Sequence, residues 1–345
     1  MERSQLKDLL VAAAYSKDAN VNFSDLNSAA KNGLVEYFGL DDLNVREIKR
    51  YSTDVFALIE EVIEQVLPMM LADRVGAFAE IKTFARDEQV KFTIKNQGKR
   101  RVVRGIAKGA RGGIYRAKKL QDADLIVPTF VYSVGYQITL EELLTGRRTV
   151  GELATLITEG FLENIYLEVI QAMRGIYTYA PANNKATASG MDLDKMRSVI
   201  RTVRAYGSPV IIGFQTEIEK LSNVAGTAFT GGITAVPNVP VEDILERRNQ
   251  GYVGMFYATP VVVIPNYFLN EQNADWMFKE QDIFVLPVDN QKPVKVALHG
   301  DIYTQQVQDP TGSMEFHAHR LMGVAIVFYN AVGIFRDSAN SVGTY

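Results

Sequence analysis

The sequence predicts an α+β fold that is built in more than one part. Three observations support this class. A helical stripe of apolar residues covers 148–176. Alternating apolar and polar residues predict strands before this helix and again near the end of the chain. Between the helix and those last strands, short helices and strands alternate. The 345 residues are 47% hydrophobic and 22% charged, which supplies apolar residues for two cores, or for one core with appendages. A disordered chain is therefore not expected.

Composition excludes several classes of function. The chain has 37 basic and 40 acidic residues and a net charge of -3, so any contact with nucleic acid should be local. It has no cysteine and three histidines, which excludes cysteine nucleophiles, disulfides, iron–sulfur clusters and cysteine-ligated zinc. No apolar run approaches the roughly 20 residues of a membrane span, and we expect a soluble protein.

Residues 1–75 are predicted to form an N-terminal arm and a leading helix. Short helices are expected near Gln5–Tyr15 and after Ser24; because they share no continuous apolar face, we expect them to lie along another surface. From Thr53 onward apolar residues recur at helical spacing, and Pro68 should end that helix. Its opposite, solvated side is expected to carry Glu60, Glu61 and Glu64.

Residues 76–132 are predicted to form a long two-stranded excursion. Phe78–Arg86, Gln89–Ile94 and Leu125–Tyr132 alternate apolar and polar residues, and a stretch rich in glycine and arginine separates the last two. A two-stranded ribbon is only marginally stable alone, so this one should lie on another surface. Residues 95–119 of this stretch hold no acidic residue and ten basic ones: Lys95, Lys99, Arg100, Arg101, Arg104, Lys108, Arg111, Arg116, Lys118 and Lys119.

Three interpretations of the basic stretch stay open. It contacts an acidic neighbour, it contacts packaged or bound nucleic acid, or it is plain solvated surface. A neighbour contact is favoured because residues 36–64 are acidic, so that one chain offers both halves of a complementary pair. The acidic residues of that segment are Glu36, Asp41, Asp42, Glu47, Asp54, Glu60, Glu61 and Glu64.

The helix predicted over 148–176 is roughly 43 Å long at 1.5 Å per residue, and we expect it to act as a strut. Together with 133–190, the returning strands of 313–345 should form one domain from two separated stretches of chain. Residues 191–312 should form a second α+β domain. Its predicted elements are helices at Met191–Ala205, Gln215–Asn223 and Glu242–Asn249, and strands at Pro209–Phe214, Tyr252–Tyr257, Val261–Ile264, Ile283–Val288 and Val294–Leu298.

Glu315, His317 and His319 form the one candidate metal site. At positions i, i+2 and i+4 of a predicted strand, all three side chains point to the same face, within reach of one cation. The alternative is a polar strand face at a subunit contact. The adjacent carboxylates Glu60–Glu61 and Glu141–Glu142 fall on solvated helix sides, and no nucleophile elbow, zinc-protease or phosphate-loop motif is present.

The order of these parts resembles that of tailed-bacteriophage major capsid proteins with the Johnson fold. The resemblance covers essentially the whole chain and depends on arrangement more than on an invariant motif. The stretches that resemble the family are Ala123–Thr129 leading into Tyr136–Leu144, Val210–Glu219, Gly254–Pro265 and Arg320–Tyr329.

The resemblance implies an N-terminal arm with a leading helix (1–75), an extended β-loop (76–132), a peripheral domain (133–190 with 313–345) that contains the spine helix, and an axial domain (191–312). It implies a structural protein without cofactor or catalysed reaction. Copies of the chain would assemble as pentamers and hexamers into an icosahedral shell around double-stranded DNA.

The same resemblance implies the location and the partners. The protein would reside in the virion and assemble in the host cytoplasm, with portal, scaffolding or decoration proteins as further partners and no membrane. No coiled-coil segment precedes the arm, so we expect no built-in scaffolding segment. Two alternatives stay open. One is an encapsulin-type compartment shell, which shares the fold and encloses a cargo protein, and the other is a metal-dependent enzyme built on Glu315, His317 and His319.

Overall fold

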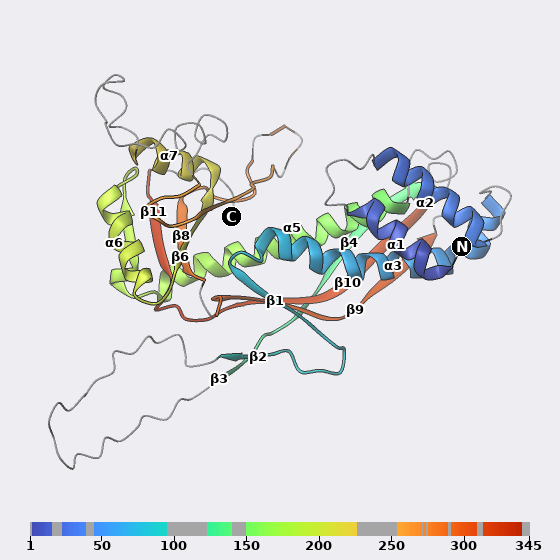
Figure 1. The fold of residues 1–345 in the computed structure, drawn as a ribbon, viewed down its shortest axis with the longest axis horizontal. Coiled ribbons are helices and arrows are strands. Elements are labelled where there is room, and N and C mark those ends of the chain that lie inside the picture. Colours follow the sequence, from blue (N-terminus) through green and yellow to red (C-terminus); the bar gives the residue numbers. More distant parts are fainter. Residues whose placement is uncertain are drawn as a thin grey trace, which may run out of the picture.

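A computed structural model of the chain describes residues 2–15, 23–38, 45–94, 123–139, 150–225, 254–268, 270, 272–273, 275–288, 291–308 and 313–339. Its helices are α1 (Arg3–Ala14), α2 (Phe23–Phe38), α3 (Val45–Val75), α5 (Val150–Tyr179), α6 (Leu193–Arg204) and α7 (Gln215–Ala225), with a 3-10 turn at Ala182–Asn184. Its strands are β1 (Ala79–Phe84), β2 (Lys91–Ile94), β3 (Ala123–Ile126), β4 (Phe130–Thr139), β5 (Lys185–Ala188), β6 (Pro209–Phe214), β7 (Val261–Ile264), β8 (Asp282–Pro287), β9 (Val294–Gln308), β10 (Ser313–Ile326) and β11 (Gly333–Asp337). The α+β prediction is confirmed (Figure 1).

A four-stranded sheet of order β1-β9-β10-β4 forms one half of the molecule. Strand β10 pairs antiparallel with both β9 and β4, while β1 runs parallel to β9. Helices α3 and α5 contact each other and this sheet, and α1 contacts both helices (Figure 1). Val62, Phe161 and Leu298 are fully buried where these layers meet, so the sheet and the helices share one apolar core.

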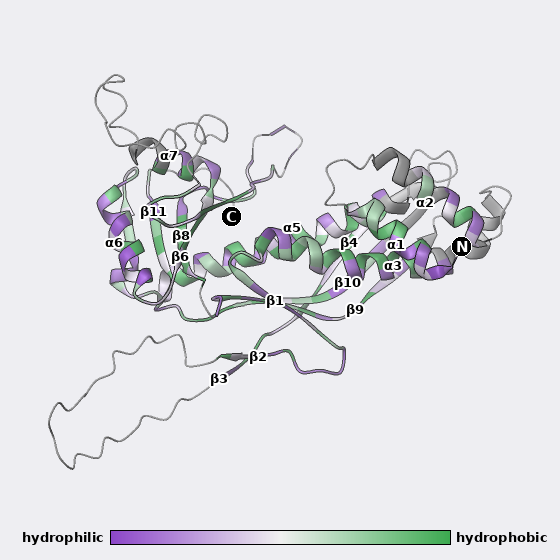
Figure 2. Cartoon of the chain, viewed as in Figure 1, coloured by the Kyte–Doolittle hydropathy of each residue, from purple (hydrophilic) through white to green (hydrophobic). Residues whose placement is uncertain are grey.

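Helix α5 is the strut that the sequence predicts, with its start and its end shifted by two or three residues. Six residues of the predicted stripe are buried, Leu153, Ile157, Phe161, Ile165, Val169 and Met173, and Ala154, Leu162, Tyr166 and Ile170 are buried beside them. The buried face is wider than one stripe because the sheet covers one side of the helix while α1 and α3 cover another. Figure 2 shows hydrophobic residues along this helix. Within the described ranges, no helix is both long and apolar enough to cross a membrane.

Helix α1 packs on its own chain, contrary to the expectation for the arm. Leu6 and Leu10 are fully buried in the main core, and the Thr155 hydroxyl of α5 donates a hydrogen bond of 3.2 Å to the Ala14 carbonyl. The sequence analysis missed the apolar face within this helix. Leu6, Leu10 and Ala13 follow one another at i, i+4 and i+7 and form a narrow apolar stripe. This stripe is wide enough to bury the helix on its own chain because it packs against α3 and α5 together.

Helix α3 continues through Pro68 to Val75, so the predicted stop was also wrong. A proline inside a helix costs about 3 kcal/mol, because it lacks an amide hydrogen and its ring crowds the preceding turn. Leu67 and Leu71, on either side of Pro68, are fully buried in the core. Burying two leucine side chains contributes roughly 3–6 kcal/mol, which offsets that cost.

The predicted two-stranded excursion is confined, among the described residues, to β2 and β3. They pair antiparallel from Lys91 opposite Ile126 to Ile94 opposite Ala123, while β1 and β4 belong to the four-stranded sheet. Phe92 packs edge-to-face on Phe84 with ring centroids 5.5 Å apart, in a small core that includes Ala297 of β9. The base of the ribbon is thus anchored on the chain's own sheet, and the basic stretch 95–119 lies outside the described residues.

A five-stranded sheet of order β5-β11-β8-β6-β7 forms the other half. Helices α6 and α7 pack on one face of this sheet and form a second apolar core with it, which includes Val199 and Val285. The side chains of the other face, Ile212 and Phe284 among them, belong to the main core. Every residue of β6 is buried, as expected for a strand covered on both faces. The predicted strands Pro209–Phe214 and Val261–Ile264 have the observed bounds.

Two strands lie in a different sheet from the one that the sequence predicts. Val294–Leu298, expected in the second α+β domain, opens the long strand β9 of the four-stranded sheet. Val332–Phe335, expected beside the long helix, overlaps β11, which pairs with β5 and β8 in the five-stranded sheet. Tyr252–Tyr257 forms no strand in its described part, and the predicted helix Glu242–Asn249 lies outside the described residues.

A substitution at Gly333 tests how closely α6 packs on β11. A Cβ atom at this position would lie 2.4 Å from Val199 Cγ1 and 2.9 Å from Val203 Cγ2, both on α6. We expect Gly333→Ala to lower the free energy of unfolding by about 1–3 kcal/mol, as for other overpacked cores. The control is Gly175→Ala in α5, where a Cβ meets nothing within 4 Å and helix propensity should raise stability. Urea unfolding measures the stability of both variants. An unchanged midpoint for Gly333→Ala would contradict close packing of α6 on β11.

Candidate functional site

The acidic residues predicted to contact a neighbour include two that bind the chain's own backbone. Glu60 accepts hydrogen bonds from the amide and the hydroxyl of Thr304, and Glu64 accepts one of 3.1 Å from the Ile302 amide. These carboxylates therefore join α3 to β9, and the expectation of a fully solvated side was wrong. Burial lowers the pKa of the Arg320 guanidinium, and the nearby carboxylates of Glu64 and Asp301 oppose that shift.

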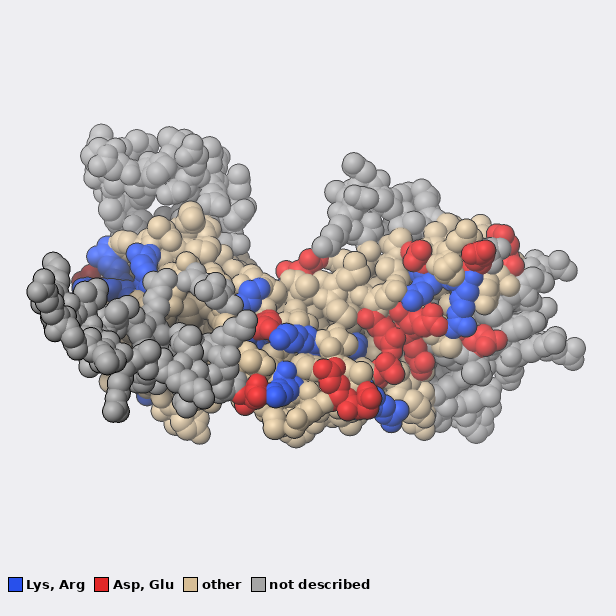
Figure 3. All heavy atoms as spheres, turned by 60° about the horizontal axis from the view of Figure 1, so that its bottom comes forward, with Lys and Arg blue, Asp and Glu red and all other residues tan. Residues whose placement is uncertain are grey.

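Three more of the predicted acidic residues are at least partly exposed on this half of the molecule. Glu61 pairs with Arg3 at 2.5 Å, while Glu36 and Asp54 are exposed. Figure 3 shows acidic atoms gathered toward the end of the molecule that carries α1 and α3. Asp41, Asp42 and the side chain of Glu47 lie outside the described residues, as do all ten predicted basic contacts. A contact between the acidic and basic sets stays a prediction.

The ribbon base exposes apolar residues that the sequence analysis missed. Ile126, Phe130 and Val131 are 59%, 61% and 64% exposed, and we call these three residues the apolar shoulder. They lie where the chain passes from β3 into β4, which is an edge strand of its sheet among the described residues. A signal was available, because Phe130, Val131 and Tyr132 are consecutive and neighbouring strand residues point to opposite faces. Several large apolar side chains exposed on one short segment are typical of interaction surfaces.

The structure places His317 and His319 on one face of β10, as predicted. Their imidazole centroids are 6.4 Å apart with an interplanar angle of 15°, and Nδ1 of His319 lies 2.5 Å from the Ser133 hydroxyl oxygen of β4. The side chain of Glu315 lies outside the described residues. Within the described part of the chain, no three potential ligands lie close enough to hold one metal ion.

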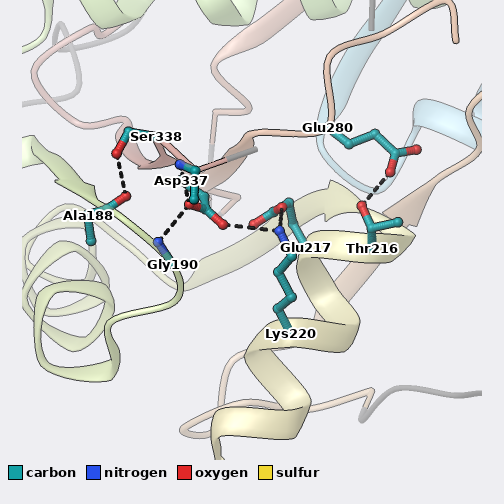
Figure 4. Close-up of polar contacts among 9 residues, drawn as sticks. Ala188, Gly190, Thr216, Glu217, Lys220, Glu280, Asp337 and Ser338 are labelled. Atoms are coloured by element: carbon teal, nitrogen blue, oxygen red, sulfur yellow. Dashed lines mark hydrogen bonds and ion pairs between the residues drawn. The ribbon is translucent and has the colours of Figure 1, made fainter. Parts of the chain in front are cut away.

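A buried polar cluster ties the end of β11 to its surroundings (Figure 4). The Asp337 carboxylate is 1% exposed and accepts hydrogen bonds from the amides of Gly190 and Ala339, at 2.8 and 2.9 Å. The Lys220 ammonium of α7 lies 3.1 Å from Asp337 and 2.6 Å from Glu217. Burial raises the pKa of the Asp337 carboxyl, but the two amides and Lys220 more than offset it, so that the pKa lies below its usual value.

The lowered pKa of Asp337 predicts a pH-dependent contribution to stability. A carboxyl whose folded pKa is depressed stabilises the fold above its unfolded pKa of about 3.9 and loses this contribution as pH falls through the folded value. We expect Asp337→Asn to lower the free energy of unfolding by about 3 kcal/mol at pH 7. The difference between variant and wild type should shrink below about pH 4. Urea unfolding across pH checks this; a difference independent of pH would contradict it.

A second buried carboxylate joins α5 to the five-stranded sheet. Asp282 of β8 has a fully buried side chain, and Arg336 of β11 donates to both of its oxygens, at 2.6 and 3.0 Å. Arg174 of α5 approaches the same carboxylate at 3.5 Å. Hydrogen bonding to Asp282 raises the pKa of Arg336, whereas burial lowers that of Arg174. The centroid of the Tyr177 ring lies 3.9 Å from the Arg336 guanidinium, so Tyr177 also links α5 to β11.

Solved structures with a similar fold include the capsid of cyanophage P-SCSP1u (10% identity, TM-score 0.47, covering 76% of this chain and 86% of that one) and Microbacterium phage Oxtober96 (11%, 0.47, 76% and 90%). The SrpI encapsulin complex of Synechococcus elongatus is also similar (8%, 0.45, 77% and 88%). No curated protein matches the sequence. The model of one family, described as "SPbeta prophage-derived putative capsid protein YonB", matches residues 26–336, which confirms the resemblance that the sequence predicts. Because the match spans most of the chain, the protein belongs to this capsid-protein family.

Proposed function

We propose that the chain is the repeating subunit of an icosahedral shell that encloses double-stranded DNA. Residues 191–312 would form the axial domain at the centres of pentamers and hexamers, although β9 enters the other sheet from Val294 onward. Residues 133–190 with 313–345 would form the peripheral domain, and residues 76–132 would lie across the adjacent subunit. The mechanism is assembly without a catalysed reaction, in the host cytoplasm, and the product is the virion.

Membership of a capsid-protein family is the observation that carries this proposal. The structure adds a surface suited to assembly, because the apolar shoulder and the edge strand β4 lie together at the ribbon base. A contact between this surface and a different patch on the next copy repeats head to tail, and it closes into a ring when the rotation allows. Copies of the chain are therefore the first partners, and portal, scaffolding and decoration proteins are proposed as further ones.

Electron microscopy of the purified full chain, combined with analysis of the particle contents, tests the proposal. We expect closed particles of uniform size, and nuclease-protected double-stranded DNA in particles taken from the producing host. Closed particles that hold a cargo protein and no DNA would favour an encapsulin-type compartment. Monomers that stay unassembled at high concentration, alone and in host lysate, would reject the shell.

A further inference from the structure

The hairpin 254–260 contains an unusual turn. Phe256 and Thr259 exchange two backbone hydrogen bonds of 2.8 and 3.0 Å, which close a two-residue turn. The two central residues, Tyr257 and Ala258, have φ angles of 49° and 53°. Hairpin turns with both central residues left-handed ordinarily carry Asn-Gly, since a side chain in this conformation costs roughly 1–2 kcal/mol per residue. A tyrosine and an alanine here indicate that surrounding contacts hold the turn.

Two arginines of α6 supply these contacts. Nη2 of Arg204 donates to the Tyr257 carbonyl at 2.7 Å and to the hydroxyl of buried Thr259 at 3.2 Å. The Arg197 guanidinium lies 4.5 Å from the centroid of the Tyr257 ring, and Phe256 meets that ring edge-on at 4.5 Å. The turn is therefore held rigidly, and the direction of the tyrosine ring is set before any partner arrives.

The held turn presents its side chains to solvent. Tyr257 and Met255 are 45% and 62% exposed. Arg197, Arg201 and Arg204 follow at i, i+4 and i+7 and form one exposed stripe on α6, the arginine stripe. Arg201 makes no ion pair or hydrogen bond with any described residue. Figure 3 shows basic atoms at the end of the molecule that carries α6. Tyrosine and arginine are enriched among the residues that contribute most to protein interfaces, and preordering lowers the cost of binding.

A complementary acidic surface lies elsewhere on the same chain. Glu159 and Glu163 are one turn apart on α5 and both exposed, and neither pairs with a cation within the described part of the chain. Partial burial beside β4 raises the pKa of the Glu163 carboxyl, and repulsion from Glu159 raises it further. Glu159 and Glu163 lie in the N-terminal half of α5, whereas α6 lies near the other end of that helix (Figure 1), so one chain does not bring the two surfaces together.

We propose that the hairpin 254–260 and the arginine stripe dock on the Glu159–Glu163 face of α5 in a second copy of this chain. The guanidinium groups would offset the repulsion between the two carboxylates, and charged hydrogen bonds of this kind fix orientation as well as attraction. Because the contact joins two different surfaces, it repeats from copy to copy. This inference rests on the proposed assembly function and names one of its contacts.

Site-directed crosslinking tests the contact, because the natural chain contains no cysteine. The full chain with Arg201→Cys and Glu163→Cys is treated with a short bis-maleimide and separated under denaturing conditions. We expect a ladder of dimers, trimers and larger products, whereas either single variant should stop at dimers. The matched control is Lys195→Cys with Glu163→Cys, since Lys195 lies on the same helix but away from the stripe, and it should give no ladder.

The outcomes separate this contact from the shell itself. No ladder, or an equal ladder in the Lys195 control, overturns the docking whether or not particles form. A ladder without closed particles supports the docking and rejects the icosahedral shell. Charge exchange gives a second readout: Arg201→Glu should lower the assembled fraction about tenfold, and adding Glu163→Arg should restore it. Lys195→Glu, with the same charge change, should leave assembly unaltered; failure of the exchange to restore it overturns the pairing.

Discussion

Closed particles are expected to disappear when Arg100, Arg101 and Arg104 are replaced together by glutamate. The change takes the three positions from +3 to -3 in a stretch without any acidic residue. If this stretch contacts an acidic surface of the next subunit, attraction becomes repulsion, and juxtaposed like charges cost several kcal/mol per interface. The subunit itself should stay folded and soluble. Sedimentation measures the assembled fraction, electron microscopy the particles, and circular dichroism the fold of the subunit.

The matched control replaces the same three arginines by lysine. It keeps the charge and removes only the planar guanidinium groups, so particles should form, with lower stability if bidentate pairing contributes. Particles of normal yield and stability from the glutamate variant would reject the contact with an acidic neighbour and favour plain solvated surface. Particles that form normally but lose their DNA would instead assign the stretch to nucleic acid.

Replacing Asp282 by asparagine is expected to destabilise the subunit by about 3–5 kcal/mol, the usual loss when one partner of a buried ion pair is removed. The side chain keeps its shape but loses its charge, which leaves the guanidinium groups of Arg174 and Arg336 without their shared counter-charge. Because the site joins α5 to β8 and β11, the two halves of the molecule should separate more readily. Urea unfolding measures the loss, and limited proteolysis near Ala180 measures the separation.

Two further variants identify the physical cause. Adding Arg174→Met and Arg336→Met to Asp282→Asn should recover part of the loss, since no stranded charge stays buried. Asp194→Asn removes a carboxylate that is 90% exposed and pairs with Arg197 at 3.1 Å, and it should change stability by less than about 1 kcal/mol. If Asp282→Asn proves as mild as Asp194→Asn, the buried joint contributes little to the fold.

The sequence by itself determined several of the helices and strands and suggested the family. The stripe over 148–176 predicts α5, and the apolar runs Pro209–Phe214 and Val261–Ile264 predict β6 and β7 with their observed bounds. These predictions succeed because periodicity within one segment reports which face meets a core. The order of the elements was also sufficient to suggest the capsid family, which the family match confirms.

Only the tertiary structure decided which strands pair and which charges are already used. Val294–Leu298 and Val332–Phe335 are strands as predicted, yet each joins the sheet that the sequence did not favour. The sequence pattern predicts that Glu60 and Glu64 are solvated, whereas in the fold they accept hydrogen bonds from amides of β9. Likewise, the turn at Tyr257 is bound by an arginine some 50 residues earlier in the chain. The periodicity of one segment shows which of its faces is buried, but not against which element. Strand pairing, hydrogen bonds between elements and a strained turn depend on groups that meet only after distant parts of the chain pack.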